Sequence, residues 1–305
     1  MRETHHRNAS YGACETHNQC ASHVRCETHA LRAFNTKELD VKDKRPEPNP
    51  RKHPELWQAY LWWHELMEMQ KRHNLRIIAA ERGKSNYSAA FERDMLEVVH
   101  LDEVLSYARS LMVEYGQAVG PVWDWLTSIK GLGAGGEAAK LLAQIDDIGK
   151  FVTISKLWAF AGWAVDNDGE TQHLKKGQKA PYNRDLKAIC WRIADQFVKQ
   201  RTPVYREEYD SYKEDDRRKH PNVICQKCGS LFPPDVKRCP GCKATNTGYN
   251  LLYCAAHLDA RARRKIAKLF LSHLWVKWRE EDGLPVSDPY VIAVLEHTNM
   301  IPVPV

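Results

Sequence analysis

Two Cys-x-x-Cys pairs separated by ten residues constrain the fold of this chain more than any other feature of its sequence. Each pair forms a tight knuckle that contributes two thiolates. The two pairs together can hold one metal ion, because four thiolates complete the tetrahedral shell that zinc prefers. Since four protein ligands leave no position for a reactive water, the predicted role of Zn²⁺ is structural. The predicted ligands are Cys225, Cys228, Cys239 and Cys242.

Nearby residues complete this expectation. Gly229 and Gly241 permit the tight turns that would point backbone N–H groups at the sulfur atoms. Cys254 and His257 lie just downstream, but we leave them out of the predicted shell because four thiolates already fill it. The predicted zinc ribbon occupies roughly residues 224–247.

Composition argues against membrane and secreted proteins. No stretch is long and apolar enough to span a bilayer, and the first residues lack the apolar core of a signal peptide. Nine cysteines could form disulfides, yet four with metal-site spacing in a chain of 305 residues favour a reducing compartment. We therefore expect a cytoplasmic protein without a membrane partner.

The N-terminal residues carry a short repeat. Glu-Thr-His recurs at residues 3–5, 15–17 and 27–29, a period of 12 residues that offers no apolar face to bury. Three interpretations stay open: a His/Cys metal-binding tract, a disordered tail, or a translated tandem DNA repeat in which 12 codons correspond to 36 nucleotides. Four prolines among charges at residues 42–54 indicate a linker. We expect residues 1–54 to be a disordered repeat-bearing tail and linker, and whether residues 1–35 belong to the protein stays open.

Helical periodicity begins after this linker. Residues 55–82 form one predicted helix, and Ser85 or Asn86 is expected to cap a second that runs to about Gly116. The apolar stripe of the second helix is predicted to contain Phe91, Met95, Val98, Asp102, Leu105 and Ala108. Two long helices joined by a short turn predict a coiled-coil-like hairpin over residues 55–118.

The rest of the chain is also predicted to be helical, apart from the ribbon. Helices are expected at residues 121–128, 183–201, 203–219 with Pro203 in its first turn, 257–280, and after Asp288. The fold class is therefore mainly α: a helical hairpin, a helical domain over residues 119–222, an inserted zinc ribbon at 223–248, and C-terminal helices at 249–305 that complete the helical domain.

A glycine-rich turn precedes one further helical segment. Gly131, Gly133, Gly135 and Gly136 allow positive φ and expose N–H groups where a helix begins, which is a ready site for phosphate. The alternative is a plain interhelical turn.

Basic residues recur around this turn, on the loop near residue 177 and on two helices. On the final helix they share one face, while Leu258, Ala262, Ile266, Leu269 and Leu274 are predicted to form the buried face. A solvated surface is the alternative for any single lysine, but the set favours contact with a nucleic-acid backbone. The predicted contacts are Lys130, Gly131, Gly133, Lys175, Lys176, Lys179, Arg184, Arg192, Arg261, Arg264, Lys265 and Lys268. Lys187 lies on the same predicted helix as Arg184 and Arg192.

Enzyme signatures are weak. Asp146, Asp147, Asp166 and Asp168 cluster around turns, where we interpret them as helix caps and loop residues rather than as a magnesium site. There is no Gly-x-x-x-x-Gly-Lys-Ser/Thr phosphate loop and no nucleophile elbow. No catalytic residue is assigned; enzymatic activity stays open, and its absence is favoured.

One segment resembles a known group of proteins. Gly-Leu-Gly at residues 131–133, Ala-Ala-Lys-Leu-Leu-Ala-Gln-Ile at 138–145, Asp-Ile-Gly-Lys-Phe at 147–151, Leu157 and Ala-Gly at 161–162 resemble the C-terminal domain of bridge-RNA insertion-sequence transposases. The segment is also similar to the Nop domain of box C/D ribonucleoproteins. Unlike the transposases, this chain shows no alternating strands before Gly131, and residues 163–169 contain no serine that could match their nucleophile.

With those two differences, the chain resembles the Tas proteins of tandem-interspaced-guide-RNA systems, which are prokaryotic or phage proteins. The resemblance implies a Nop-like, helix-hairpin-helix-type domain that holds a short guide RNA and targets DNA without a nuclease site of its own. It leaves open a homodimer and a nuclease that acts in trans. One alternative is a transposase- or recombinase-like protein with a divergent catalytic site, and another is a zinc-ribbon regulatory protein that binds DNA without a guide.

Overall fold

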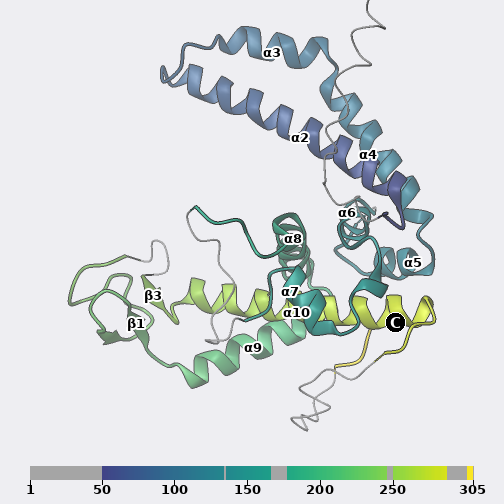
Figure 1. The fold of residues 1–305 in the computed structure, drawn as a ribbon. Coiled ribbons are helices and arrows are strands. Elements are labelled where there is room, and N and C mark those ends of the chain that lie inside the picture. The colour runs from purple at the N-terminus through teal and green to yellow at the C-terminus, as the bar shows by residue number, and fades with distance from the viewer. Residues whose placement is uncertain (1–49, 134, 166–176, 246–249, 287–300, 305) are drawn as a thin grey trace, which may run out of the picture. The chain divides into compact units, whose positions relative to one another are not determined.

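The computed structural model describes residues 50–133, 135–165, 177–245, 250–286 and 301–304, which belong to one compact unit that begins at Pro50. This part of the chain is mainly helical, as predicted, and it contains one small antiparallel sheet (Figure 1). The repeat at residues 1–35, most of the linker and the helix expected after Asp288 lie outside the described residues. Among the described helices, none is both long enough and apolar enough to cross a membrane.

The predicted hairpin is present, but its second side is made of two helices. Helix α2 (Pro54–Glu81) packs against both α3 (Ala89–Val98) and α4 (Leu101–Gln117) (Figure 1). His100, which has a left-handed φ of 46°, separates α3 from α4. The cap of α3 is Ser88, whose hydroxyl accepts the Phe91 N–H, so the prediction of Ser85 or Asn86 was wrong. Ser85 instead accepts the Tyr87 N–H inside the preceding turn.

The interruption at His100 also shifts the phase of the apolar stripe. Leu105 and Ala108 of α4 are buried as predicted, whereas Phe91 is 61 % exposed and Val98 is 72 % exposed. The side of α3 that faces α2 carries Glu92 instead, which lies 2.5 Å from the His73 Nδ1. The continuous stripe predicted for this segment was therefore wrong in its first half.

The core is built around α6 (Gly136–Ile145), which packs against α2, α4, α5 (Pro121–Ser128) and α8 (Arg184–Gln200). Trp123 of α5 fills the space beside two glycines. A Cβ on Gly116 would lie 2.5 Å from its ring and a Cβ on Gly135 would lie 2.6 Å from it. The absence of side chains at these two positions therefore sets how closely α4, α5 and the start of α6 approach one another.

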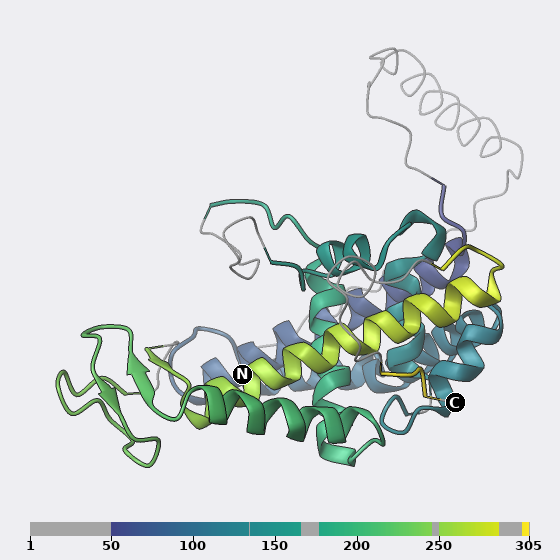
Figure 2. The same ribbon diagram turned by 90° about the horizontal axis from the view of Figure 1, so that it is seen from below.

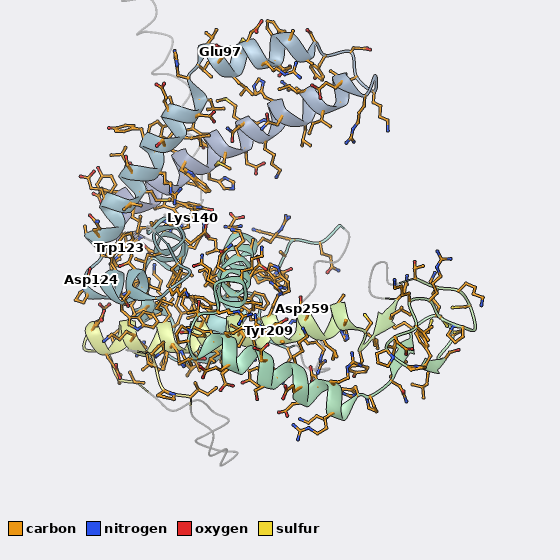
Figure 3. The ribbon with its side chains drawn as sticks, turned by 180° about the vertical axis from the view of Figure 1, so that it is seen from behind. Glu97, Trp123, Asp124, Lys140, Tyr209 and Asp259 are labelled. Carbon is orange, nitrogen blue, oxygen red and sulfur yellow. The ribbon has the colours of Figure 1, made fainter. Side chains whose placement is uncertain are left out.

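The long helix α10 (Ala255–Glu281) forms the other side of the core. It packs against α5, α8, the short helix α7 (Ile154–Phe160) and α9 (Tyr205–Lys219), and it contacts the 3₁₀ turn η1 (Ile148–Lys150) (Figure 2). Its Trp275 and Trp278 side chains are fully buried in the core. Figure 3 shows Tyr209 of α9 beside Asp259 of α10, and the Tyr209 hydroxyl donates to that carboxylate.

Two helices differ in detail from their predictions. The buried face of α10 is confirmed at Leu258, Ala262, Ile266 and Leu274, while Leu269 is only half-buried. Helix α9 begins at Tyr205 rather than at Pro203, because Val204 adopts a φ of 66° that no continuous helix permits.

The sheet contains β1 (Val223–Cys225), β2 (Leu231–Phe232) and β3 (Leu251–Leu252) in the order β2-β1-β3, with both pairs antiparallel. Val223, Phe232 and Leu251 form a small apolar cluster beneath it. The third strand lies beyond residue 248, so the ribbon extends further along the chain than predicted and is followed almost directly by α10 (Figure 2).

Candidate metal centre and nucleic-acid interface

The four predicted ligand cysteines converge. Their sulfur atoms all lie within 4.8 Å of one another, with 3.5 Å between those of Cys225 and Cys242 and 3.4 Å between those of Cys228 and Cys239. A tetrahedral shell with Zn–S bonds of about 2.3 Å requires sulfur separations of about 3.8 Å. The donor set therefore fits a metal ion of this kind.

The two Cys-x-x-Cys knuckles have the same backbone pattern. The Gly229 N–H donates to the Cys225 carbonyl at 2.8 Å, and the Lys243 N–H donates to the Cys239 carbonyl at 2.9 Å. The residue after each pair has positive φ, 72° at Gly229 and 59° at Lys243. In the second knuckle, then, Lys243 takes the conformation that we had expected to depend on Gly241.

Gly241 serves a different purpose. A Cβ at this position would lie 2.9 Å from the Ser230 Oγ and 3.6 Å from the Cys228 Sγ. Gly241 therefore allows the second knuckle to approach the first closely enough for the sulfur atoms to converge.

The thiols influence one another's ionisation. Hydrogen bonds from Ser230 lower the pKa of Cys228 to about 6. At Cys242 the Ala244 N–H lowers the pKa, but the interaction with Cys225 and burial outweigh it and raise the pKa to about 11. Four thiolates cannot all carry charge at this separation without a cation among them, and a bound divalent metal would supply that charge.

Cys254 and His257 have other roles, as expected. The Tyr253 N–H donates to the His257 Nδ1 at 2.9 Å, and the Cys254 thiol donates to the Leu251 carbonyl at 3.3 Å. Both residues therefore fix the junction between β3 and α10 rather than the metal.

The glycine turn has the predicted backbone at three of its four glycines. Gly131, Gly133 and Gly135 have positive φ, whereas Gly136, for which positive φ was also expected, is the first helical residue of α6. The turn is tightly packed on two sides, because a Cβ on Gly136 would lie 2.9 Å from the Arg109 Nε and a Cβ on Gly131 would lie 3.2 Å from the Thr202 Oγ1.

A carboxylate already lies in the first turn of α6. Glu137 binds the Lys140 ammonium at 2.8 Å and the Arg192 guanidinium at 3.4 Å. Lys130 is exposed, and its carbonyl accepts the Thr202 hydroxyl at 2.6 Å. The structure thus places Arg192 beside the glycine turn and gives it an intramolecular partner.

The basic face predicted for α10 is divided between two neighbours. Arg261 forms two hydrogen bonds with the buried Asp216 of α9, at 2.7 Å and 3.3 Å. The Lys265 ammonium lies 4.3 Å from the ring centroid of Tyr212, also on α9. Lys268 instead lies over Trp158 of α7, and the charge of Arg264 acts on Lys187 of α8.

Cations and aromatic rings lie close together on this second side. The Lys268 ammonium lies 4.1 Å from the ring of Trp158, and the Lys187 ammonium lies 4.3 Å from the ring of Tyr182 and 5.6 Å from that of Trp163. Burial is the first cause that lowers the pKa of both lysines, and the positive charge of Arg264 is the second. Arg264 therefore lies near both lysines.

Trp163 and Trp191 extend this arrangement, since their rings are nearly parallel, 12° apart, with centroids separated by 6.3 Å. We call these residues the cation–ring track; its members are Trp158, Lys268, Arg264, Lys187, Tyr182, Trp163 and Trp191.

Gly162 makes the track possible. It has a φ of 73°, and a Cβ there would lie 2.6 Å from the ring of Tyr182 and 3.0 Å from the Lys187 Cδ. Sequence reasoning named Arg264 and Lys268 but missed the four rings. The spacing of Lys187 and Trp191, one helical turn apart, was the available signal.

The remaining predicted contacts are separate from these groups. Lys179 and Arg184 are exposed, and Lys175 and Lys176 lie outside the described residues.

The clustered carboxylates act as predicted where they are described. Asp146 accepts the His53 N–H at 3.1 Å and the Lys150 ammonium at 2.6 Å, and Asp147 accepts the Gly149 N–H at 2.9 Å. Burial would raise the pKa of Asp146, but its hydrogen bonds from Lys150 and His53 lower that pKa below its ordinary value. Both residues therefore serve as structural caps, while Asp166 and Asp168 lie outside the described residues.

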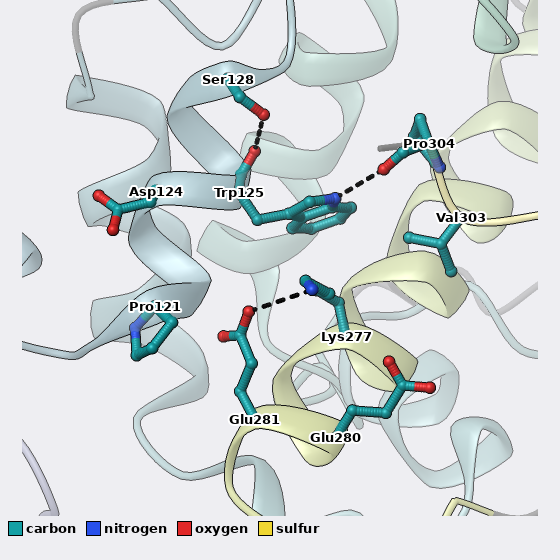
Figure 4. Close-up of a pocket in the computed structure, with 9 residues that line it drawn as sticks. All are labelled: Pro121, Asp124, Trp125, Ser128, Lys277, Glu280, Glu281, Val303 and Pro304. Atoms are coloured by element: carbon teal, nitrogen blue, oxygen red, sulfur yellow. Dashed lines mark hydrogen bonds and ion pairs between the residues drawn. The ribbon is translucent and has the colours of Figure 1, made fainter.

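A cavity of about 450 Å³ opens between α5, the end of α10 and residues 303–304 (Figure 4). The Trp125 indole N–H donates to the Pro304 carbonyl at 2.9 Å beside it. The charged side chains that line the cavity are mostly acidic. They are Asp124, Glu280 and Glu281, with one ammonium from Lys277. This charge disfavours phosphate, so the cavity is distinct in chemistry from the cation–ring track.

Comparison with known proteins adds no family: no family model matches the chain, and no curated protein matches it either.

Proposed function

We propose that this chain is an RNA-guided nucleic-acid-binding protein, which holds a short guide RNA and targets DNA without a nuclease site of its own. The observation that carries the proposal is the cation–ring track. Three cations from two helices lie together with aromatic rings, although burial and the positive charge of Arg264 both lower the pKa of Lys187 and of Lys268.

A phosphodiester backbone is the ligand that this arrangement fits. Phosphates would bind Lys187, Arg264 and Lys268, and an exposed ring beside the cations, such as Trp191, can contact sugars and bases. Small anions would use the cations but gain nothing from the rings. The guide RNA, the DNA target and the Nop-like character rest on the family resemblance of residues 131–162, and the track supports the nucleic-acid part of that proposal.

We further propose that the four-cysteine centre holds structural Zn²⁺ and that the protein acts in the cytoplasm. The donor set is all sulfur, and the six described cysteines are all free thiols, as a reducing compartment requires. Cleavage of a target would then be performed by a separate nuclease.

The first experiment is to purify the protein from its native host and to sequence the nucleic acid that copurifies. A discrete short RNA is expected. The absence of any such RNA, together with magnesium-dependent cleavage of DNA by the protein alone, would favour the transposase-like alternative.

The second experiment measures how binding depends on salt. Each phosphate contact with a single strand contributes about 0.7 to the slope of log K against log salt, so replacing Lys187, Arg264 and Lys268 by alanine should reduce the slope by about 2. Lys71→Ala is the matched control, because Lys71 is exposed on α2 and bonds only to Glu68 among the described residues. An unchanged slope in the triple variant would remove the track from the interface.

A further inference from the structure

One tryptophan of the cation–ring track is exposed and lies parallel to a buried tryptophan. Trp191 is 37 % exposed on α8, whereas Trp163, which lies parallel to it, is only 4 % exposed. One face of the Trp191 indole is thus turned toward a ring that is fixed in the core. Lys187 lies one helical turn before Trp191, on the same side of α8.

The supporting ring lies in the core. Trp163 is 4 % exposed, its backbone N–H donates to the Trp158 carbonyl at 2.8 Å, and the Lys187 ammonium lies 5.6 Å from its ring centroid. Gly162, just before it, admits Tyr182 at close range. Trp191 therefore rests on a base that does not need to be ordered when a ligand arrives, which lowers the entropic cost of binding.

The charge beside Trp191 favours an anionic ligand. Lys187 lies one helical turn before Trp191 and near Arg264, whereas Arg192, directly after Trp191, is paired with Glu137. Asp195, one turn after Trp191, is itself paired with Lys199 and Arg263. An indole next to Lys187 and Arg264 suits an anionic ligand with flat rings, rather than the apolar surface of another protein.

We propose that Trp191 is a stacking platform for an unpaired base of the bound nucleic acid, next to phosphates held by Lys187 and its neighbours on the track. The inference rests on the proposed function and specifies it further. The site takes a single-stranded segment, because the bases inside a duplex already stack on both faces and cannot cover the indole.

The test compares Trp191→Ala and Trp191→Phe with the wild-type chain. The probes are a 5′-labelled single-stranded RNA of about 12 nucleotides, within the range of site sizes known for single-strand binders, and a blunt duplex of the same sequence. Stacking on an aromatic ring contributes about 1–3 kcal/mol for each base, so Trp191→Ala should weaken single-strand binding by about 5- to 150-fold. Trp191→Phe should retain most of the affinity, and duplex binding should change less than about twofold.

Trp62→Ala is the matched control. Trp62 is 36 % exposed on α2 and packs edge-on against Tyr107, away from the cations of the track. It should leave single-strand affinity unchanged. The salt slope gives an independent readout, because Trp191→Ala should preserve it while Lys187→Ala should reduce it.

Three results would overturn the inference: unchanged single-strand affinity in Trp191→Ala, an equal loss for single strand and duplex, or a reduced salt slope in that variant. If Lys187→Ala weakens binding while Trp191→Ala does not, the stacking role fails but the proposed function stands. If the wild-type chain binds neither probe, both fail. Urea unfolding of each variant confirms that lost binding is not lost folding.

Discussion

Replacing Gly135 by alanine tests how the start of α6 is closed by Trp123. Gly133→Ala is the matched control in the same turn. Both glycines have positive φ, 79° at Gly135 and 66° at Gly133. They differ in their surroundings, since a Cβ on Gly135 would lie 2.6 Å and 2.7 Å from two ring atoms of Trp123, whereas a Cβ on Gly133 would meet no atom within 4 Å.

The expected losses follow from these contacts. Placing an L-residue in the left-handed region costs about 1 kcal/mol, and this term is common to both variants. Gly135→Ala must also displace the Trp123 ring, which is 6 % exposed and has little space to move. Overpacking of this kind costs about 1–3 kcal/mol, so we expect losses of about 1 kcal/mol for Gly133→Ala and about 2–4 kcal/mol for Gly135→Ala.

Urea unfolding followed by tryptophan fluorescence measures both values. The midpoint should fall in each variant while the slope of free energy against urea stays constant. Equal losses for the two variants would refute the reasoning, because they would show that Trp123 does not occupy the position described beside Gly135. A change in slope would instead report an altered native or unfolded state.

Three further predictions concern the metal centre, a buried ion pair and a helix cap. Cys225→Ser should reduce bound zinc well below one ion per chain by elemental analysis, whereas Cys190→Ser should retain it, since Cys190 is buried in the main core. Burial would raise the pKa of Asp216, but hydrogen bonds from Arg261 lower it; Asp216→Asn should therefore destabilise the fold at pH 7, and the difference in melting temperature from wild type should shrink as the pH falls below about 4. Ser88→Ala should cost about 1 kcal/mol in urea unfolding through loss of the cap on α3, and no loss would contradict that cap.

Features that depend on local spacing were predictable from the sequence. The four metal ligands follow from two short motifs, and α2, α5, α8 and α10 follow from periodicity and cap residues. Gly131 and Gly133 were correctly expected to have positive φ, because no other residue type adopts it so readily.

Features that depend on tertiary contacts were not predictable. His100 and Val204 take positive φ without any sequence signature, and each moves a helix boundary. Lys243 also takes positive φ, in the second knuckle, where its N–H donates to the Cys239 carbonyl. The cation–ring track joins residues of α7, α8 and α10, so its composition becomes visible only once these helices are packed.

The continuity of α10 has a mechanical consequence. The helix has 27 residues, which corresponds to about 40 Å at 1.5 Å per residue. Its first turn is tied to the ribbon through Tyr253 and His257, and its last turns are clamped by Trp275 and by Arg279, which donates to the Phe151 carbonyl at 3.3 Å. Because one continuous helix joins the ribbon to the core, a displacement of the ribbon is passed directly to the core. Arg264 and Lys268 lie between the two ends, where a rotation of α10 would turn them relative to α8.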